Sequence, residues 1–96
     1  MGKKNGYREQ AAVLGILANE SRLAIIDFLQ VRERNVSEIV KRLQLDQSTV
    51  SKHLTLLRTA GLIEGRREGN RVVYQLVLPC VVDLCSCVSQ VLRKRR

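Results

Sequence analysis

The stretch that most constrains the fold of this chain is residues 46–61, DQSTVSKHLTLLRTAG. Val50, Leu54 and Leu57 recur at i, i+4 and i+7, the spacing of a single apolar helical face. Asp46 is a good N-cap, and Gly61 suits the left-handed position that follows a last helical turn. The pattern therefore predicts a helix over about 46–60. Its opposite face is polar, so that face is expected to meet water or a polar partner.

A shorter amphipathic segment, NVSEIVKRLQL, comes just before this helix. Ser37 can cap it, and its apolar side chains stand at helical spacing: Ile39, Val40 and Leu43. Only Gln44 and Leu45 remain to connect the two helices. Two helices joined by so short a turn are typical of the unit that lays its second helix in the major groove of duplex DNA.

The next segment, LIEGRREGNRVVYQLVL, places apolar and β-branched residues on both sides of a Glu68-Gly69-Asn70 tip. Such a pattern predicts a β-hairpin, here over about 62–77. Its tip is basic, because Arg66, Arg67 and Arg71 bracket it.

Helices are also expected at both ends of the chain. Apolar spacing predicts two before the turn unit, over 7–18 and over 20–31, with Asn19 as N-cap of the second. Pro79 suits the first turn of a last helix over about 79–93. We therefore expect a mostly α fold with a β-hairpin wing (α+β), with about five helices and two strands. This single winged helix-turn-helix domain would span 7–96, after a disordered basic N-terminus at 1–6.

Charge and composition narrow the class of molecule that this protein can bind. The 17 Lys and Arg residues against nine Asp and Glu give a net charge of +8, which favours an anionic partner. Two Tyr, one Phe and no Trp offer no stacking platform for single-stranded nucleic acid. No apolar run approaches the roughly 20 residues that cross a bilayer, and the first residues lack the apolar region of a signal peptide. We therefore expect a cytoplasmic protein that does not bind membranes. Double-stranded DNA fits these observations best.

Candidate DNA contacts follow from the polar face of the 46–60 helix, its neighbours and the hairpin tip. Gln47 can pair with adenine, and Lys52 can reach guanine or a phosphate. The full set is Gln47, Ser48, Thr49, Ser51 and Lys52 on the helix, Lys41 and Arg42 before it, and Arg66, Arg67 and Arg71 at the tip. A solvated helix face and a protein-interaction module are the alternatives.

His53 is the only histidine, and it could serve structure, contact DNA or bind a ligand. No general base accompanies it or the cysteines in a nucleophile pattern, and no phosphate loop is visible. The chain is therefore not expected to be an enzyme, and DNA binding needs no cofactor.

The stretches LANESRLAIIDFLQ and VSEIVKRLQLDQSTVSKHLTLLRTAGLIEGRREGNRVVYQL strongly resemble the bacterial and archaeal ArsR/SmtB repressors over nearly the whole chain. This resemblance implies a winged helix that forms a homodimer through its first and last helices and binds an inverted-repeat operator. It also implies release from DNA when a metal ion, a metalloid or a reactive species binds. Family DNA contacts map onto Gln47, Ser48, Ser51 and Lys52, and the wing onto residues 64–72.

Two sensing sites of this family are missing from the sequence. Asn35-Val36-Ser37 stands where some arsenic and cadmium sensors carry Cys-x-Cys, and Asp83-Leu84-Cys85 stands where zinc sensors carry Asp-x-His. What remains is a cluster of three cysteines on the last helix: Cys80, Cys85 and Cys87.

Three thiols suit trivalent arsenic or antimony, or another soft metal ion, as an inducer. A regular helix nevertheless separates Cys80 from Cys87 by roughly 10.5 Å and turns Cys85 about 200° from Cys87. One helix cannot chelate with all three, so a site needs a distorted helix start or thiols from two subunits. A redox or persulfide switch is the second possibility. The third is plain packing, since Val81, Leu84, Cys85, Val88, Val91 and Leu92 form a stripe suited to a dimer interface.

Overall fold

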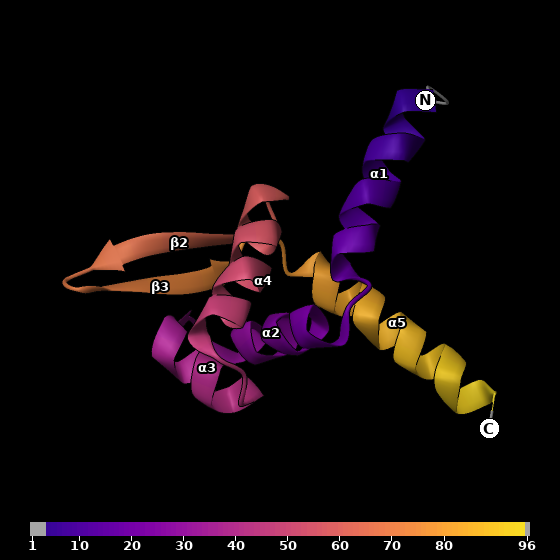
Figure 1. Cartoon of the computed structure of the whole chain (residues 1–96). Helices are drawn as coiled ribbons and strands as arrows, with labels where there is room; N and C mark the ends of the chain where they lie inside the picture. The colour runs from indigo at the N-terminus through magenta and orange to yellow at the C-terminus, as the bar shows by residue number, and fades with distance from the viewer. Residues whose placement is uncertain (1–3, 96) are drawn as a thin grey trace.

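The computed structural model describes residues 4–95. Its elements, in chain order, are α1 (Lys4–Leu17), α2 (Glu20–Val31), β1 (Arg34–Asn35), α3 (Val36–Leu43), α4 (Gln47–Thr59), β2 (Ile63–Glu68), β3 (Arg71–Leu76) and α5 (Cys80–Lys94). The expected winged helix-turn-helix, with five helices and a β-hairpin, is confirmed (Figure 1). None of the helices between residues 4 and 95 has the length and apolarity needed to cross a membrane.

Helix α4, the second helix of the helix-turn-helix, has a cap at each end. The Asp46 side chain accepts a hydrogen bond from the Thr49 backbone N–H at 2.8 Å, as its N-cap role requires. At the other end Gly61 has φ 84, and the N–H groups of Gly61 and Leu62 bond to the carbonyls of Arg58 and Leu57. This is the Schellman arrangement that ends a helix at a left-handed residue. Local sequence therefore sets both ends of α4.

The cap of α3 differs from the prediction. Asn35, not Ser37, is the N-cap: its side chain accepts from the Glu38 N–H, and the Glu38 carboxylate accepts from the Asn35 N–H, both at 2.9 Å. This reciprocal capping box satisfies two backbone donors, whereas a cap at Ser37 would satisfy one and start the helix two residues later.

Two other expectations need correction. A third strand exists, because β1 pairs antiparallel with β3, and the sheet order is β1-β3-β2. The pair Arg34 and Asn35 is too short to show strand periodicity in the sequence. In addition, α1 begins at Lys4, three residues before the predicted start at residue 7, since extending an existing helix costs little per residue. Residues 1–3 lie outside the described part of the chain.

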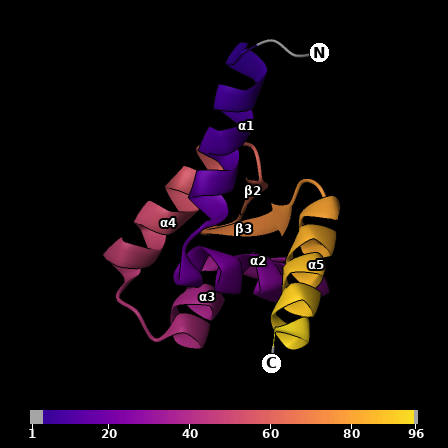
Figure 2. The same cartoon turned by 90° about the vertical axis from the view of Figure 1, so that its right-hand side faces the viewer.

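The core lies under the helix-turn-helix. Ile25, Ile39, Val50 and Leu57 are fully buried, and side chains of α2, α3, α4 and β2 meet there. Helices α1 and α5 instead project from this body, α1 upward and α5 to the lower right in Figure 1. In the view of Figure 2, α1 still rises at the top and α5 lies at the right, beside α2. The wing and these two helices therefore extend on different sides of one core.

The wing is a two-stranded hairpin with a two-residue loop. Gly69 takes φ 63 in that loop, a conformation that favours glycine. Gly65 pairs with Tyr74 across the strands, and a Cβ at Gly65 would lie 2.9 Å from the Tyr74 ring. A side chain at position 65 would displace the ring, so glycine there lets Tyr74 lie across the strand.

Candidate nucleic-acid interface

The exposed side of α4 carries the polar residues predicted to contact DNA. Val50, Leu54 and Leu57 turn one side of the helix into the core. Because α-helical residues advance by about 100°, most of the remaining side chains form a polar arc on the other side, with the apolar Leu56 exposed at its edge. The polar side chains exposed on it are Gln47, Ser48, Ser51, Lys52, Thr55, Arg58 and Thr59, while Thr49 is half-buried. The structure thus brings the predicted helix residues onto one surface, and adds Thr55, Arg58 and Thr59.

The first turn of α4 is held by Asp46. Its carboxylate accepts the Thr49 N–H and, at 3.4 Å, the Ser48 hydroxyl. Hydrogen bonds from Thr49, and then from Ser48, lower the pKa of Asp46 below its ordinary value, so the cap is ionised at neutral pH. The helix N-terminus still offers unpaired backbone N–H groups, which favour a phosphate or a base acceptor.

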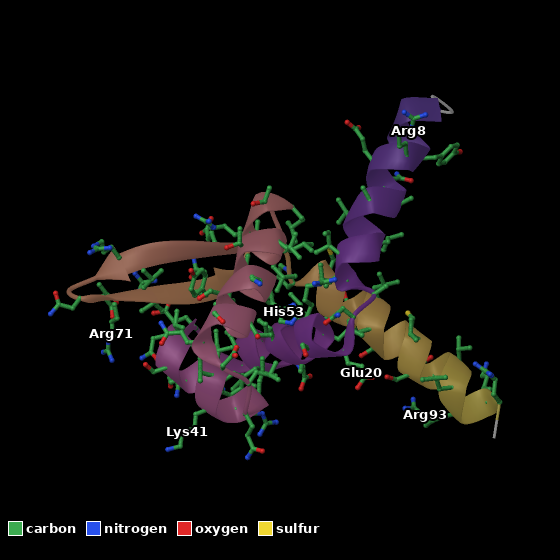
Figure 3. All side chains as sticks on the ribbon, viewed as in Figure 1. Arg8, Glu20, Lys41, His53, Arg71 and Arg93 are labelled. Atoms are coloured by element: carbon green, nitrogen blue, oxygen red, sulfur yellow. The ribbon has the colours of Figure 1, made fainter. Side chains whose placement is uncertain are left out.

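Helix α3 carries two cations that flank α4. Lys41 and Arg42 are exposed in the last turn of α3. The Arg42 guanidinium also lies 5.5 Å from the Phe28 ring, and that of Arg34 lies 3.8 Å from the same ring. In Figure 3, Lys41 and Arg71 of the wing both extend from the lower side of the molecule. Cations from two separate elements therefore face the same side in this view.

The three wing arginines are not equivalent. The Arg66 guanidinium donates to both carboxylate oxygens of Glu33, at 2.6 and 2.8 Å, and to Glu68 at 2.7 Å. These hydrogen bonds lower the pKa of Glu33 and raise that of Arg66. Among residues 4–95, neither Arg67 nor Arg71 forms an ion pair. Arg66 thus ties the wing to the loop before β1, while the other two cations stay available to a partner.

Glu33 also belongs to this surface, and it was not among the residues predicted from the sequence. It lies 33 residues from Arg66, and nothing in the local pattern links the two. Its only sequence signal is that it is an acid between two arginines, in RERN at residues 32–35.

The three cysteines do not converge within one chain. Cys80 and Cys87 are exposed on α5, and Cys85 is half-buried. Across the described range 4–95, no three His, Cys, Asp or Glu side chains come close enough to hold a metal ion. The regular helix keeps the thiols apart, as their spacing predicted, so a single subunit offers no three-thiolate site.

The proposed interface stripe on α5 also needs adjustment. Val81 is buried against its own core, and Cys85 lines a groove within its own chain. The exposed apolar side chains are Leu84, Val88, Val91 and Leu92. Cys80 and Cys87 share a side of the helix with Leu84 and Val91, because the spacing 80, 84, 87, 91 follows successive turns. Two of the three thiols therefore lie on the outer apolar side of α5.

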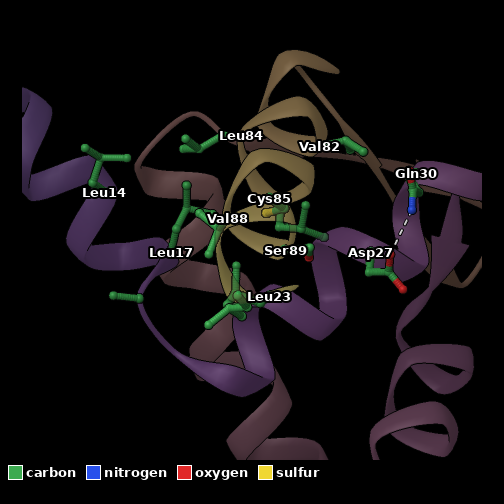
Figure 4. Close-up of a pocket in the computed structure, with 13 residues that line it drawn as sticks. Leu14, Leu17, Leu23, Asp27, Gln30, Val82, Leu84, Cys85, Val88 and Ser89 are labelled. Atoms are coloured by element: carbon green, nitrogen blue, oxygen red, sulfur yellow. Dashed lines mark hydrogen bonds between the residues drawn. The ribbon is translucent and has the colours of Figure 1, made fainter. Parts of the chain in front are cut away.

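A groove of about 560 Å³ runs between α1, α2 and α5 (Figure 4). Its walls are almost entirely apolar and include Leu14, Leu23, Leu84 and Val88, with Cys85 among them. Asp27 and Gln30, joined by a 2.8 Å hydrogen bond, mark one polar edge. The groove therefore joins exposed apolar side chains of α1 and α5 into one apolar surface.

Three features lie together in this fold: an exposed polar helix with a capped N-terminus, a preceding helix that carries cations, and a basic wing. Together they define a winged helix-turn-helix DNA-binding regulator. Comparison with known proteins identifies the family. Residues 19–65 match the family model described as bacterial regulatory protein, arsR family.

Individual relatives agree with this match. The chain is 32% identical over 89 residues to the uncharacterised HTH-type transcriptional regulator Rv0081 of Mycobacterium tuberculosis, covering 92% of this chain and 78% of that protein. It is 36% identical over 70 residues to the arsenical resistance operon repressor of Staphylococcus aureus, covering 73% and 67%. The chain belongs to the ArsR family, and as a member of a family of DNA-binding regulators it is not an enzyme.

Solved structures show the same fold. The crystal structure of M. tuberculosis Rv0081 superposes with a TM-score of 0.85 at 30% identity, covering 96% of this chain and 93% of that one. A solution structure of the homodimeric winged helix-turn-helix domain of Mb0332 from Mycobacterium bovis gives 0.82 at 33% identity, covering 98% and 91%.

Proposed function

We propose that this protein is a transcriptional repressor that binds an inverted-repeat operator in double-stranded DNA as a symmetric homodimer. The observation that supports this proposal is the polar arc of α4. Its side chains are exposed along the helix, and Asp46 caps the helix N-terminus. Gln47, Ser48, Thr49, Ser51 and Lys52 would read bases and phosphates in the major groove. Two copies related by a twofold axis would place two such helices about one DNA turn apart.

The flanking cations would contact the DNA backbone. Lys41 and Arg42 would lie beside the phosphates next to the recognition helix, and Arg67 and Arg71 would follow the backbone from the wing. Arg66 would support DNA binding mainly by holding the wing in position, because its guanidinium is already bonded to Glu33 and Glu68.

The dimer would use the apolar surface of α1 and α5. Leu14, Val88 and Val91 are each about half exposed in the single chain. Burying them against a second copy removes apolar area from water, which is the main driving force for such association. A twofold arrangement would also cover the groove between α1, α2 and α5 from outside.

The repression test is fluorescence anisotropy with the duplex upstream of the protein's own gene, beside a scrambled duplex of equal length. The expected result is tight binding to the first and weak, salt-sensitive binding to the second. Equal affinity for both duplexes at every salt concentration would refute the proposal and favour a protein-interaction module. A promoter–reporter fusion then gives the sign of regulation, and a fall in reporter output is expected.

The proposed inducer is a thiol-binding species, with arsenite or antimonite as first candidates. Trivalent arsenic binds three thiolates, and one subunit cannot supply three converging ones, so the thiols of both subunits would contribute. Exposure of Cys80 and Cys87 on the outer side of α5 supports such sharing. Binding there would alter the spacing of the two recognition helices, and a coupling of about 1–3 kcal/mol would lower DNA affinity roughly 5- to 150-fold.

The inducer test uses the reduced protein on its operator, titrated separately with arsenite, zinc and a persulfide donor. The control is the triple variant Cys80→Ser, Cys85→Ser, Cys87→Ser. Release of the wild type but not the variant by arsenite supports a metalloid sensor, and release by the persulfide donor alone supports a redox switch. Persistent binding under every addition would assign the cysteines to packing.

A further inference from the structure

One side chain joins three helices on the side of α4 that faces away from the proposed DNA surface. Arg22, in the first turn of α2, donates from Nε to the Ile16 carbonyl at the end of α1, at 2.6 Å. Its Nη1 lies 3.2 Å from Nδ1 of His53 in the middle of α4. The same residue's backbone N–H bonds to the Asn19 cap at 3.0 Å. Arg22 is thus fixed at both its backbone and its guanidinium.

The contact between Arg22 and His53 sets the protonation state of the ring. A guanidinium has only donors, so Nδ1 must be the acceptor and the proton of the neutral ring lies on Nε2. Burial of the ring, and then the positive charge of Arg22, lower the pKa of His53 below 6.5. A protonated ring would place an N–H against an N–H and a cation beside a cation, which breaks the link.

His53 stands next to Lys52 on α4 but is partly buried, with its ring against Arg22 of α2. Figure 3 labels it on the middle of α4. Six residues separate it from Gln47, about 9 Å along the helix axis, so a small rotation at His53 moves the whole polar arc. Through the Ile16 carbonyl, Arg22 connects this point to α1, whose Leu14 is half exposed.

We propose that neutral His53 is a positioning residue for DNA binding: held by Arg22, it fixes the recognition helix on the α1–α2 junction. This inference rests on the proposed function, because its readout is operator affinity. It also gives the dimer-forming helix α1 a direct polar connection to the helix that would read DNA.

The chain offers an unusually clean test, since His53 is its only histidine. Ordinary side-chain pKa values leave no other group that titrates between about pH 5 and 7. The sign is also informative. The link is complete while the ring is neutral, and it is lost as the pH falls through the lowered pKa of His53. Simple charge attraction predicts the opposite, because an added cation would tighten binding to DNA.

The experiment measures operator affinity by anisotropy from pH 7.5 to 5.5 at constant ionic strength, with melting temperature and dimer mass recorded at each pH. For the wild type we expect affinity to fall toward low pH, by at most about tenfold per pH unit for each His53 of the dimer once the pH is below its lowered pKa. His53→Asn supplies an oxygen acceptor near the Nδ1 position at any pH, so it should bind like the wild type at pH 7.5 and show no pH dependence. His53→Leu lacks an acceptor and should bind more weakly at all pH values. Ser86→Ala, exposed on α5 and outside the lining of the groove, is the control and should keep the wild-type profile.

Three results would overturn the proposal: tighter wild-type binding at low pH, an unchanged pH profile in His53→Asn, or wild-type affinity of a folded His53→Leu at pH 7.5. If His53→Leu does not fold, the pH profile of His53→Asn alone tests the proposal. Failure of the wild type to prefer its operator at pH 7.5 would instead refute the proposed function, and this role with it. The ¹⁵N chemical shift of Nδ1 checks the link without DNA, because an accepting, unprotonated nitrogen is expected.

Discussion

Arg67→Gln should flatten the salt dependence of operator binding. Arg67 is exposed on β2, and within residues 4–95 no carboxylate pairs with it. If each wing places Arg67 on one phosphate, a dimer loses two contacts, and the slope of log affinity against log salt falls by about 1.8, at about 0.9 per contact. Between about 50 and 200 mM salt, the variant should therefore lose roughly 12-fold less affinity than the wild type.

The assay is anisotropy on one operator duplex at five salt concentrations, with the slope as the readout. The matched control is Arg66→Gln, which removes the same charge from the neighbouring residue. Because the Arg66 guanidinium is already bonded to Glu33 and Glu68, its loss should weaken binding through the wing and change the slope much less. An unchanged slope in Arg67→Gln, or an equal change in both variants, would refute this division of roles.

Three further predictions concern the fold and the interface. Leu57→Ala deletes a fully buried side chain of α4 and should lower the free energy of unfolding by about 2–5 kcal/mol, measured by urea denaturation. Gly65→Ala places a Cβ against the Tyr74 ring and should cost about 1–3 kcal/mol, whereas wild-type stability would show that the ring moves freely. Val88→Asp puts a charge on the outer side of α5 and should give a folded monomer in sedimentation, while a stable dimer would place the interface elsewhere.

Much of the fold was predictable because its signals are local. Asn19 and Asp46 cap the helices as expected, and Gly61 ends α4 in the left-handed conformation. These features depend on neighbours within a few residues, which the sequence displays directly. The two-residue strand β1 and the Asn35 cap were missed. A strand of that length has no period of its own. The Asn35 cap did have a sequence signal, because Glu38 stands three residues later at the spacing of a capping box.

The candidate site divides in the same way. The sequence by itself determined which side of α4 is apolar and which is polar, because helical geometry converts spacing into a face. It also determined that three thiols on one regular helix cannot converge, since the rise per residue alone separates them.

Only the tertiary structure decided which charges are free and which are held. Arg66 meets Glu33 across 33 residues, and Arg22 meets His53 across 31. Tertiary packing likewise places the Cys85 side chain in the groove of its own chain and leaves Cys80 and Cys87 exposed. Such contacts depend on how helices and strands pack around the core, and residue spacing along the chain carries no information about partners that folding brings together from distant segments.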